Sequence, residues 1–249
     1  QASIILVNTQ LGDDGYAADF VESAILDIAI NLKKVDKKYH YIILSSTVLP
    51  GTINKLISTI EKISGKRFEQ DFGFAYVPDF VKLGSVINDF KNPDFFLVGC
   101  NNTKDLECVH EIWDGLHSNN CGHYSLTLEE TEIAKVSLNA YIVSKITFAN
   151  FLGELCKGMN NVNVHNITNV IGIDQRIGTK FFGAGAPYGG TCFPRDATAF
   201  IKFAKDRHHI AKNLIFAQEV NGMVLDSIAK ECNSYKNIGI LGKCYYSKH

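Results

Sequence analysis

The segment from residue 189 to residue 196, GGTCFPRD, places a thiol, a cation and a carboxylate close together in the chain. The glycines that precede Cys192 allow the backbone to turn tightly and to approach a ligand closely. Residues 197–204 have a helical pattern, and both a helix N-terminus and the neighbouring Arg195 favour the thiolate form of a cysteine. A cysteine is usually a small core residue, but these neighbours favour Cys192 as a nucleophile.

A lysine and an asparagine, Lys135 and Asn139, lie four positions apart in a helical pattern over residues 129–156. This spacing places both side chains on one face of a helix. The spacing alone does not separate a functional pair from an ordinary solvated face. Arg176, within DQRIG at residues 174–178, is by itself typical of surface charge.

Continuous apolar runs predict buried strands at residues 3–8, 41–44, 72–77 and 95–98. Amphipathic patterns predict helices between them, one that begins with Asp19 as its cap and one over residues 53–63. Strands that alternate with helices are typical of an α/β protein, and this segment has the pattern of half a doubly wound fold.

The strand pattern stops near residue 126, where the long helix begins, and further helical stretches reach about residue 234. Residues 238–241 again have a strand pattern. A dinucleotide fold usually carries GxGxxG at its first strand–helix turn, and we find no such fingerprint in this position. The glycines at 183 and 185 follow no buried strand, so they are not predicted to form that loop.

The composition argues against several classes of partner. The chain has 249 residues, a formal net charge of −1 and 46% hydrophobic residues, which suits a globular protein without a polybasic surface for nucleic acid or anionic membranes. No apolar run is long enough for a membrane span, and the first residues lack a signal-peptide pattern. We therefore expect a cytoplasmic protein. The seven cysteines are never spaced as CxxC, so neither disulfides nor a metal site is expected.

Taken in order, the motifs resemble those of the UDP-glucose/GDP-mannose (nucleotide-sugar) dehydrogenase family. The segments NTQ (8–10) and STVLPGT (46–52) are similar to the family's NTP and STVP segments, and YVPDF (76–80) is similar to NPEF. Lys135 and Asn139 match K-x-x-x-N, residues 174–178 match DxRIG, and residues 189–196 match GGxCFxKD. The ordered set covers nearly the whole chain, which makes the resemblance specific.

The resemblance implies NAD-dependent oxidation of the C6 alcohol of a UDP-sugar, such as UDP-glucose, to the acid. It implies that Cys192 forms a thiohemiacetal and then a thioester, that Asp196 and Lys135 act on water and the hydroxyl, and that Lys135 and Asn139 stabilise the oxyanion. Asp79 and Thr47 would assist hydrolysis. The implied NAD contacts are Thr9, Thr47 and Arg195, and the implied substrate contacts are Phe80, Lys135, Asn139, Arg176, Phe181, Tyr188 and Gly189.

The resemblance also implies a division of the chain. Residues 1–125 would be the second half of a Rossmann-like NAD-binding domain, and residues 126–235 a central helical domain that binds substrate and forms a homodimer through its long helix. Residues 236–249 would begin a truncated third domain. The chain would thus be an internal portion of the enzyme, inactive on its own because the phosphate loop would lie before residue 1.

Some positions depart from the family pattern. Asp79 is one methylene shorter than the family's Glu, Arg195 replaces a Lys, and the family's lysine after ILG falls on Tyr246, with Lys248 nearby. Two alternatives stay open: the same chemistry on a UDP-N-acetylhexosamine or GDP-mannose, or a truncated, non-catalytic module for sugar-nucleotide binding or dimerisation.

Overall fold

The computed structural model describes residues 1–12, 15–35, 39–82 and 84–239. The chain divides into two compact units, the first ending at Val136 and the second beginning at Ser137. None of the described helices is long and apolar enough to cross a membrane.

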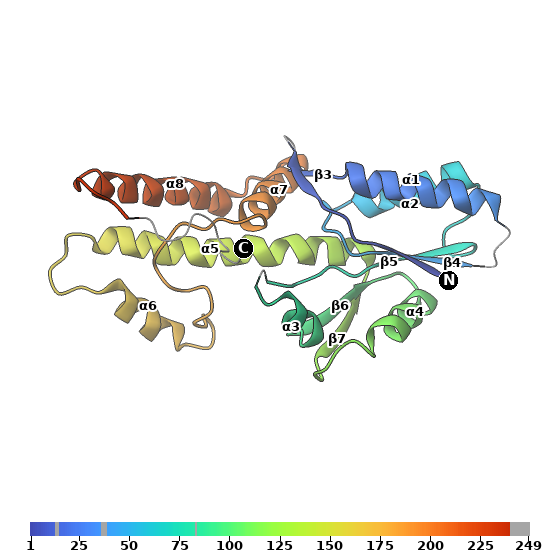
Figure 1. Ribbon diagram of the computed structural model, residues 1–249, viewed down its shortest axis with the longest axis horizontal. Helices are drawn as coiled ribbons and strands as arrows, with labels where there is room; N and C mark the ends of the chain where they lie inside the picture. The colour runs from blue at the N-terminus through green and yellow to red at the C-terminus, as the bar shows by residue number, and fades with distance from the viewer. Residues whose placement is uncertain (13–14, 36–38, 83, 240–249) are drawn as a thin grey trace. The chain divides into compact units, whose positions relative to one another are not determined.

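The first unit contains a five-stranded sheet in the order β1-β4-β5-β6-β7 (Figure 1). Its strands are β1 (Ala2–Ile5), β4 (His40–Leu44), β5 (Phe72–Tyr76), β6 (Phe95–Gly99) and β7 (Gly122–Leu126). The pairs β1–β4, β4–β5 and β6–β7 are parallel, whereas β5–β6 is antiparallel. The sheet is therefore mixed, with a change of direction between its third and fourth strands.

Helices cover both faces of this sheet, as expected for a doubly wound fold. The helices α1 (Asp19–Lys34) and α2 (Thr52–Ser64) lie on one face, and α3 (Val86–Lys91) and α4 (Thr103–Trp113) lie on the other (Figure 1). Successive side chains of β4 explain this, because Ile42 and Leu44 join the core under α1 and α2 while Ile43 joins the core under α4. Alternate residues of a strand point to opposite faces, so an apolar run can fill both cores.

A buried carboxylate ties α4 to the sheet. Asp105 is 1% exposed and accepts hydrogen bonds from the Tyr39 hydroxyl at 3.0 Å and from the Phe74 N–H at 3.1 Å. Gly73 makes room for it, since a Cβ at that position would lie 1.8 Å from an Asp105 oxygen. Burial raises the pKa of the Asp105 carboxyl, although its hydrogen bonds oppose the shift.

The fold class predicted from the sequence is confirmed, with local corrections. The first strand ends at Ile5 instead of residue 8, and a small hairpin of β2 (Gln10–Gly12) and β3 (Gly15–Ala17) follows it. Asp19 is the first residue of α1 rather than its cap, and Ala18 occupies the cap position without a side-chain hydrogen bond. The polar strand β7 was not predicted, because all five of its residues are exposed and no apolar run marks it.

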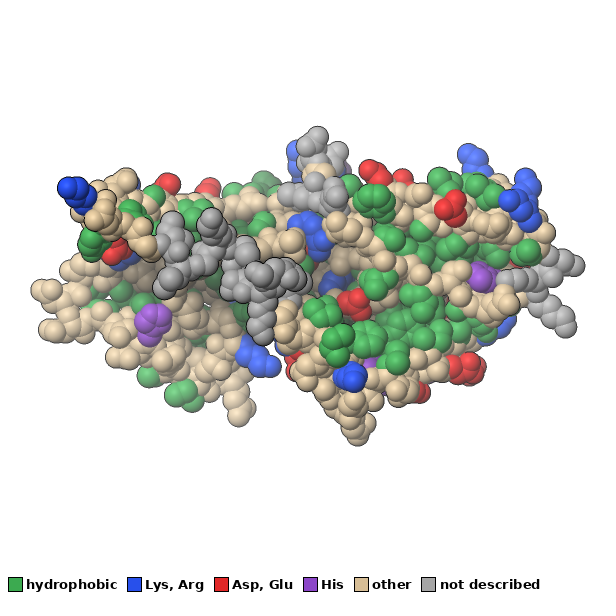
Figure 2. Space-filling view, in the orientation of Figure 1, with side chains coloured by type: hydrophobic (Ala, Val, Ile, Leu, Met, Phe, Trp, Pro, Cys, Tyr) green, Lys and Arg blue, Asp and Glu red, His purple; other side chains and the backbone are tan. Residues whose placement is uncertain are grey.

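The edge strand β1 carries apolar side chains that face solvent. Ile4 in this strand and Leu6 just after it are 51% and 67% exposed. Hydrophobic side chains also gather on the visible face of the α/β unit in Figure 2. Exposed apolar residues on an edge strand favour pairing with another strand.

The long helix α5 (Leu128–Cys156) begins in the first unit and continues into the second. Its bounds agree with the helix predicted at residues 129–156. We expected a helical domain from residue 126, and this division stays a prediction. Leu128 belongs to the core under α1 and α2, which explains why the first turns of α5 are part of the α/β unit.

The second unit is helical throughout its described secondary structure. Besides α5 it contains α6 (Val164–Gly172), α7 (Phe193–Asp206) and α8 (Lys212–Cys232). Its core joins Val143 of α5 with Ala197 of α7 and Leu214 of α8. Ile238 and Gly239 are not in a strand, and the rest of the strand predicted at 238–241, with Tyr246 and Lys248, lies outside the described residues.

Candidate active site

The thiol of Cys192 lies at the beginning of α7, as the sequence predicted. Cys192 is the N-cap residue of this helix and is exposed, and its Sγ lies 3.6 Å from the Thr191 hydroxyl. Gly190 has a φ of 79°, which only glycine adopts easily, so the turn before the thiol depends on it. Pro194 occupies the first turn, where its missing N–H costs nothing. The local sequence thus holds the thiol at the solvent-exposed end of a helix.

One turn further along α7, the carboxylate of Asp196 is completely buried. Its Oδ2 accepts a hydrogen bond from Asn139 Nδ2 at 2.6 Å, and its Oδ1 accepts one from Arg195 Nε at 3.0 Å. The backbone N–H of Asp196 donates to the carbonyl of Cys192 at 2.8 Å. The structure therefore brings together Cys192, Arg195, Asp196 and Asn139, four of the residues expected in the site.

Two asparagines hold the loop that precedes the thiol. Asn221 of α8 accepts from the N–H of Tyr188 at 2.8 Å and donates to its carbonyl at 3.1 Å. Asn150 of α5 accepts from the N–H of Gly185 at 2.8 Å and donates to the carbonyl of Ala186 at 3.3 Å. Neither asparagine was predicted to have a role. The signal available in the sequence was a polar residue among apolar neighbours in a helical pattern. Their paired bonds fix the backbone of the segment expected to contact the sugar nucleotide.

The expected loop residues differ in burial. Tyr188 is 8% exposed, and burial raises the pKa of its phenol. Phe181 is 40% exposed, has a φ of 60° and contacts Phe193 edge to face, with 6.1 Å between ring centroids. Gly189 has no atom within 4 Å of the place of a Cβ. Of the two aromatic residues expected to contact substrate, Tyr188 is thus buried and Phe181 is accessible.

In the α/β unit, Lys135 is 7% exposed and donates a hydrogen bond from Nζ to the backbone carbonyl of Asp79. The same ammonium group lies 4.5 Å from the centroid of the Phe80 ring, a cation–π geometry. Phe80 in turn packs on Phe95, with 4.8 Å between ring centroids. Burial raises the pKa of the Asp79 carboxyl, and the nearby Lys135 charge opposes the shift. The segment predicted to resemble NPEF is thus in contact with the predicted lysine.

The loops after β1 and β4 lie together at the carboxyl ends of these parallel strands. The Ser46 hydroxyl joins them, because it accepts from the N–H of Val7 at 2.7 Å and donates to its carbonyl at 2.8 Å. Thr9 is 4% exposed and Thr47 is half-buried. Ligands of open α/β sheets bind at this edge, and both threonines lie in its loops.

A glutamate that the sequence did not single out fixes the same region. Glu132 of α5 is fully buried and accepts from the N–H groups of Gly51 and Ile53, at 2.8 and 2.9 Å. It thereby caps α2, whose N-cap residue Gly51 offers no side chain. Burial raises the pKa of Glu132, and these backbone bonds oppose the shift.

Arg176 lies on the surface of the helical unit. Its side chain is 89% exposed and its Nη2 lies 2.6 Å from Oδ2 of Asp174. Hydrogen bonds from Arg176 lower the pKa of Asp174. Lys145 holds the following backbone, since its Nζ donates to the carbonyls of Ile177 and Gly178 at 2.9 and 3.2 Å. The arginine is thus presented outward on a fixed turn.

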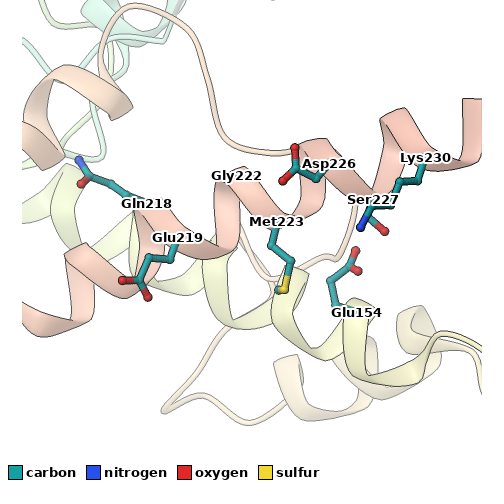
Figure 3. Close-up of a pocket in the computed structure, with 8 residues that line it drawn as sticks. All are labelled: Glu154, Gln218, Glu219, Gly222, Met223, Asp226, Ser227 and Lys230. Atoms are coloured by element: carbon teal, nitrogen blue, oxygen red, sulfur yellow. The ribbon is translucent and has the colours of Figure 1, made fainter. Parts of the chain in front are cut away.

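A hollow of about 530 Å³ on the helical unit contains none of the expected site residues (Figure 3). It lies between Glu154 of α5 and the side chains of α8, most of which are exposed. Its lining residues are Glu154, Gln218, Glu219, Gly222, Met223, Asp226, Ser227 and Lys230. The thiol and the buried carboxylate at the start of α7 therefore stay the candidate site.

Comparison with known proteins identifies the family of the chain. Residues 1–117 match the UDP-glucose/GDP-mannose dehydrogenase family, NAD binding domain, and residues 129–223 match the central domain of the same family. The UDP-glucose 6-dehydrogenase AglM of Haloferax volcanii is 32% identical over 225 residues, which cover 88% of this chain and 52% of that protein. A UDP-glucose 6-dehydrogenase of Rickettsia bellii is 30% identical over 98% of this chain and 56% of its own length. The chain spans about half the length of the curated relatives it matches.

Solved structures of nucleotide-sugar dehydrogenases have a similar fold. A UDP-glucose dehydrogenase from Pyrobaculum islandicum superposes with a TM-score of 0.84 at 26% identity, covering 94% of this chain and 52% of its own. A UDP-D-ManNAc dehydrogenase from Pyrococcus horikoshii, at 21% identity and a TM-score of 0.77, covers 92% of this chain and 54% of its own and shares the fold. NAD is the cofactor of the family's N-terminal domain, which residues 1–117 represent. With both domain models matched in chain order, this chain belongs to the UDP-glucose/GDP-mannose dehydrogenase family.

Proposed function

We propose that this chain supplies the catalytic thiol of an NAD-dependent nucleotide-sugar 6-dehydrogenase, which oxidises the C6 alcohol of a UDP-sugar, UDP-glucose first among them, to the acid. The observation that carries the proposal is the cluster at the start of α7. There an exposed Cys192 lies one helical turn from the buried Asp196, which Asn139 and Arg195 hydrogen-bond. A nucleophile beside an oriented acid–base group is the arrangement that covalent catalysis requires.

The α/β unit fits the dinucleotide at the carboxyl ends of β1 and β4. Thr9 and Thr47 lie in loops that Ser46 joins, and Glu132 fixes the start of α2 behind them. We assign Thr9, Thr47 and Arg195 to cofactor binding. When bound, NAD accepts a hydride from the sugar carbon in each of two oxidations.

The chain's own residues would handle protons and the sugar oxygen. In the first oxidation a water activated by Asp196 and oriented by Lys135 takes the C6 hydroxyl proton as the hydride leaves carbon. Cys192 then adds its sulfur to the aldehyde carbon, and the former carbonyl oxygen becomes the hydroxyl of a thiohemiacetal. Loss of that hydroxyl proton and of a second hydride gives the thioester. Water adds to the thioester, and the sulfur leaves to regenerate the thiol and the acid.

Lys135 and Asn139 suit the stabilisation of the oxygen that becomes negative in these steps. They are one turn apart on α5, and each is already oriented, Lys135 by the Asp79 carbonyl and Asn139 by Asp196. We assign hydrolysis to a water held by Asp79 and Thr47. The raised pKa of the Asp79 carboxyl makes it a stronger base than an ordinary aspartate, which favours proton removal from that water.

We assign substrate binding to the segment from Phe181 to Gly189, with Phe80 as an aromatic contact and Arg176 as the group that meets the nucleotide across a homodimer. The exposed guanidinium of Arg176 is held outward by Asp174. The helix α5 also exposes apolar side chains, among them Tyr141 at 65%, Phe148 at 51% and Leu155 at 53%. Such residues favour a contact between two copies.

The product stoichiometry tests this function. The protein at its full natural length, given UDP-glucose and NAD, should form two NADH for each UDP-glucuronate. Parallel assays with a UDP-N-acetylhexosamine and with GDP-mannose decide the substrate class. Acid formation from one of these alone would replace UDP-glucose as the substrate, and a lack of NADH with all three would favour a non-catalytic binding module.

A further inference from the structure

Histidines and a cysteine gather on the α/β unit, and none of them is a residue of the candidate active site. His110 lies in α4, His117 and Cys121 lie in the connection that follows α4, and His123 lies in β7. The ligand atoms of His117, Cys121 and His123 are all within 4.8 Å of one another. Cys121 Sγ lies 3.9 Å from His117 Nδ1.

The imidazole rings of His117 and His123 pack against a buried aromatic side chain. Phe96 of β6 is 6% exposed and pairs with His123 in the sheet register. Its ring meets the imidazoles of His117 and His123 edge to face, with centroid distances of 4.8 and 5.2 Å. The imidazoles therefore keep their positions through packing, which reduces the entropy that a ligand would have to remove.

The connection between His117 and Cys121 is fixed as well. The N–H of Ser118 donates to the carbonyl of Lys91 at 2.6 Å, and Asn119 Nδ2 donates to the carbonyl of Pro93 at 2.9 Å. Both acceptors lie in the segment that leads into β6. The backbone between His117 and Cys121 is thus anchored to the neighbouring segment. These hydrogen bonds help to fix the distance between the two side chains.

We propose that His117, Cys121 and His123 bind one zinc ion. Imidazole and thiolate are the ligands that zinc prefers, at about 2.0–2.1 Å from nitrogen and about 2.3 Å from sulfur, which places tetrahedral ligand atoms roughly 3.3–3.6 Å apart. The sulfur–nitrogen distance of 3.9 Å is within a few tenths of an ångström of that value. Binding would release the thiol proton of Cys121.

A second group of potential metal ligands shares His123 with the proposed site. His110, Asp114 and His123 also have ligand atoms within 4.8 Å of one another. The nitrogens Nδ1 of His110 and His123 are 3.3 Å apart, and Asp114 Oδ1 lies 3.1 Å from His110 Nδ1. His110, oriented by Asp114, is placed to approach the fourth position of the zinc ion or to support the imidazole of His123.

The test uses the full chain with Cys192→Ser, so that the exposed thiol of the active site does not contribute. After treatment with a chelator, the protein is titrated with Zn²⁺ against a chromophoric chelator and, separately, with Co²⁺. We expect one Zn²⁺ per chain and a cobalt–thiolate charge-transfer band. Cys121→Ser should abolish the band, and Cys121→Ser and His123→Gln should each weaken zinc binding by more than about tenfold.

The matched controls are Cys156→Ser and His165→Gln. Both residues lie outside the cluster, so these substitutions should leave zinc binding unchanged. The proposal is overturned if the chain binds less than one Zn²⁺, if cobalt gives no thiolate band, or if Cys121→Ser binds zinc as tightly as its parent. Loss of binding in Asp114→Asn but not in Cys121→Ser would place the ion in the second group and would also overturn it. His123 lies on an exposed strand, so His123→Gln tests the site without disturbing the core.

Discussion

The side-chain amide of Asn139 donates a hydrogen bond to Asp196, with 2.6 Å between Nδ2 and Oδ2. Because Asp196 is completely buried and Arg195 donates to its other oxygen, the carboxylate is held between two donors. Unpaired carboxylates are costly to bury. The two donors therefore fix the carboxylate one turn from Cys192.

The first prediction concerns this carboxylate. Asp196→Asn keeps the size of the side chain but removes its charge and its capacity to accept from both donors. We expect kcat for acid formation to fall by roughly 10²- to 10⁴-fold, the range of general acid–base catalysis, with a smaller change in KM. Asp206→Asn, at the exposed end of the same helix where Asp206 pairs with Lys202, is the control. Equal and small effects of both substitutions would remove Asp196 from the chemistry.

The second prediction concerns the nucleophile. Cys192→Ala should leave affinity for the sugar nucleotide close to that of the unsubstituted protein, because the thiol forms its bond after binding. Formation of the acid should be lost. Calorimetry and product analysis of the protein at its natural length measure both, with Cys156→Ala as the control. Acid production at the normal rate in Cys192→Ala would show that another group attacks the aldehyde.

The third prediction concerns Lys135. Lys135→Met keeps an unbranched side chain of similar length but removes the ammonium donor, so kcat should fall by about 10²- to 10³-fold, as for loss of one oxyanion donor. Substrate affinity should change much less, since the oxyanion forms only during reaction. Lys62→Met, at an exposed position of α2, controls for loss of charge. A change in affinity as large as the change in rate would make Lys135 a simple binding group.

The fourth prediction concerns Glu132 and pH. The raised pKa of its carboxyl means that the folded chain holds this proton more tightly than the unfolded chain. The contribution of Glu132 to the free energy of unfolding should therefore fall as pH rises from the ordinary glutamate value of about 4.3 to the higher folded value. Glu132→Gln should remove this slope. It should also cost about 1–3 kcal/mol near neutral pH, because one backbone N–H loses its acceptor.

Urea unfolding as a function of pH measures both effects of Glu132→Gln. The control is Glu129→Gln, whose carboxylate accepts from Asn54 at 2.8 Å on an exposed surface. Its effect should stay within about 0.5 kcal/mol, as for most surface substitutions. If the two variants have the same stability and the same pH slope, Glu132 does not cap α2 in solution.

The fifth prediction concerns the space at Gly73. Gly73→Ala would place a Cβ 1.8 Å from Asp105 Oδ1, and Asp105 cannot move without breaking its bonds to Tyr39 and Phe74. We expect a loss of about 1–3 kcal/mol or more in the free energy of unfolding. Gly115→Ala, with no atom within 4 Å of the new methyl group, should be close to neutral. Similar stabilities for the two variants would show that the sheet adjusts around Asp105.

Apolar periodicity predicted most of the elements that hold the site. The runs at β4, β5 and β6 fill cores on both faces of the sheet, and the pattern of α5 covers nearly its whole length. The pattern contains no information on strand direction, so the antiparallel pairing of β5 with β6 was not foreseen. The exposed strand β7 has no apolar run, and for that reason it was missed.

The site was predictable where its residues are close in sequence. Cys192, Arg195 and Asp196 lie within one helical turn, and the structure brings them together as expected. Asn150, Asn221 and Glu132 were missed because each acts on backbone far away in the chain. The histidine–cysteine cluster was not predicted, because its cysteine is not part of a CxxC motif. The pattern of His117, Cys121 and His123, with its histidines on either side of the cysteine, was the signal available.

The cap that Glu132 gives to α2 also sets an order of events during synthesis. Ile53 at the start of α2 finds its acceptor 79 residues later in the chain, which is roughly 4 to 16 s of translation at about 5–20 residues per second. Until α5 begins to form, the first turn of α2 has no side-chain cap of its own and frays. The loop after β4 ends where this turn begins. We therefore expect the loop to reach its final structure only after synthesis of α5, the helix that contains Asn139, has begun.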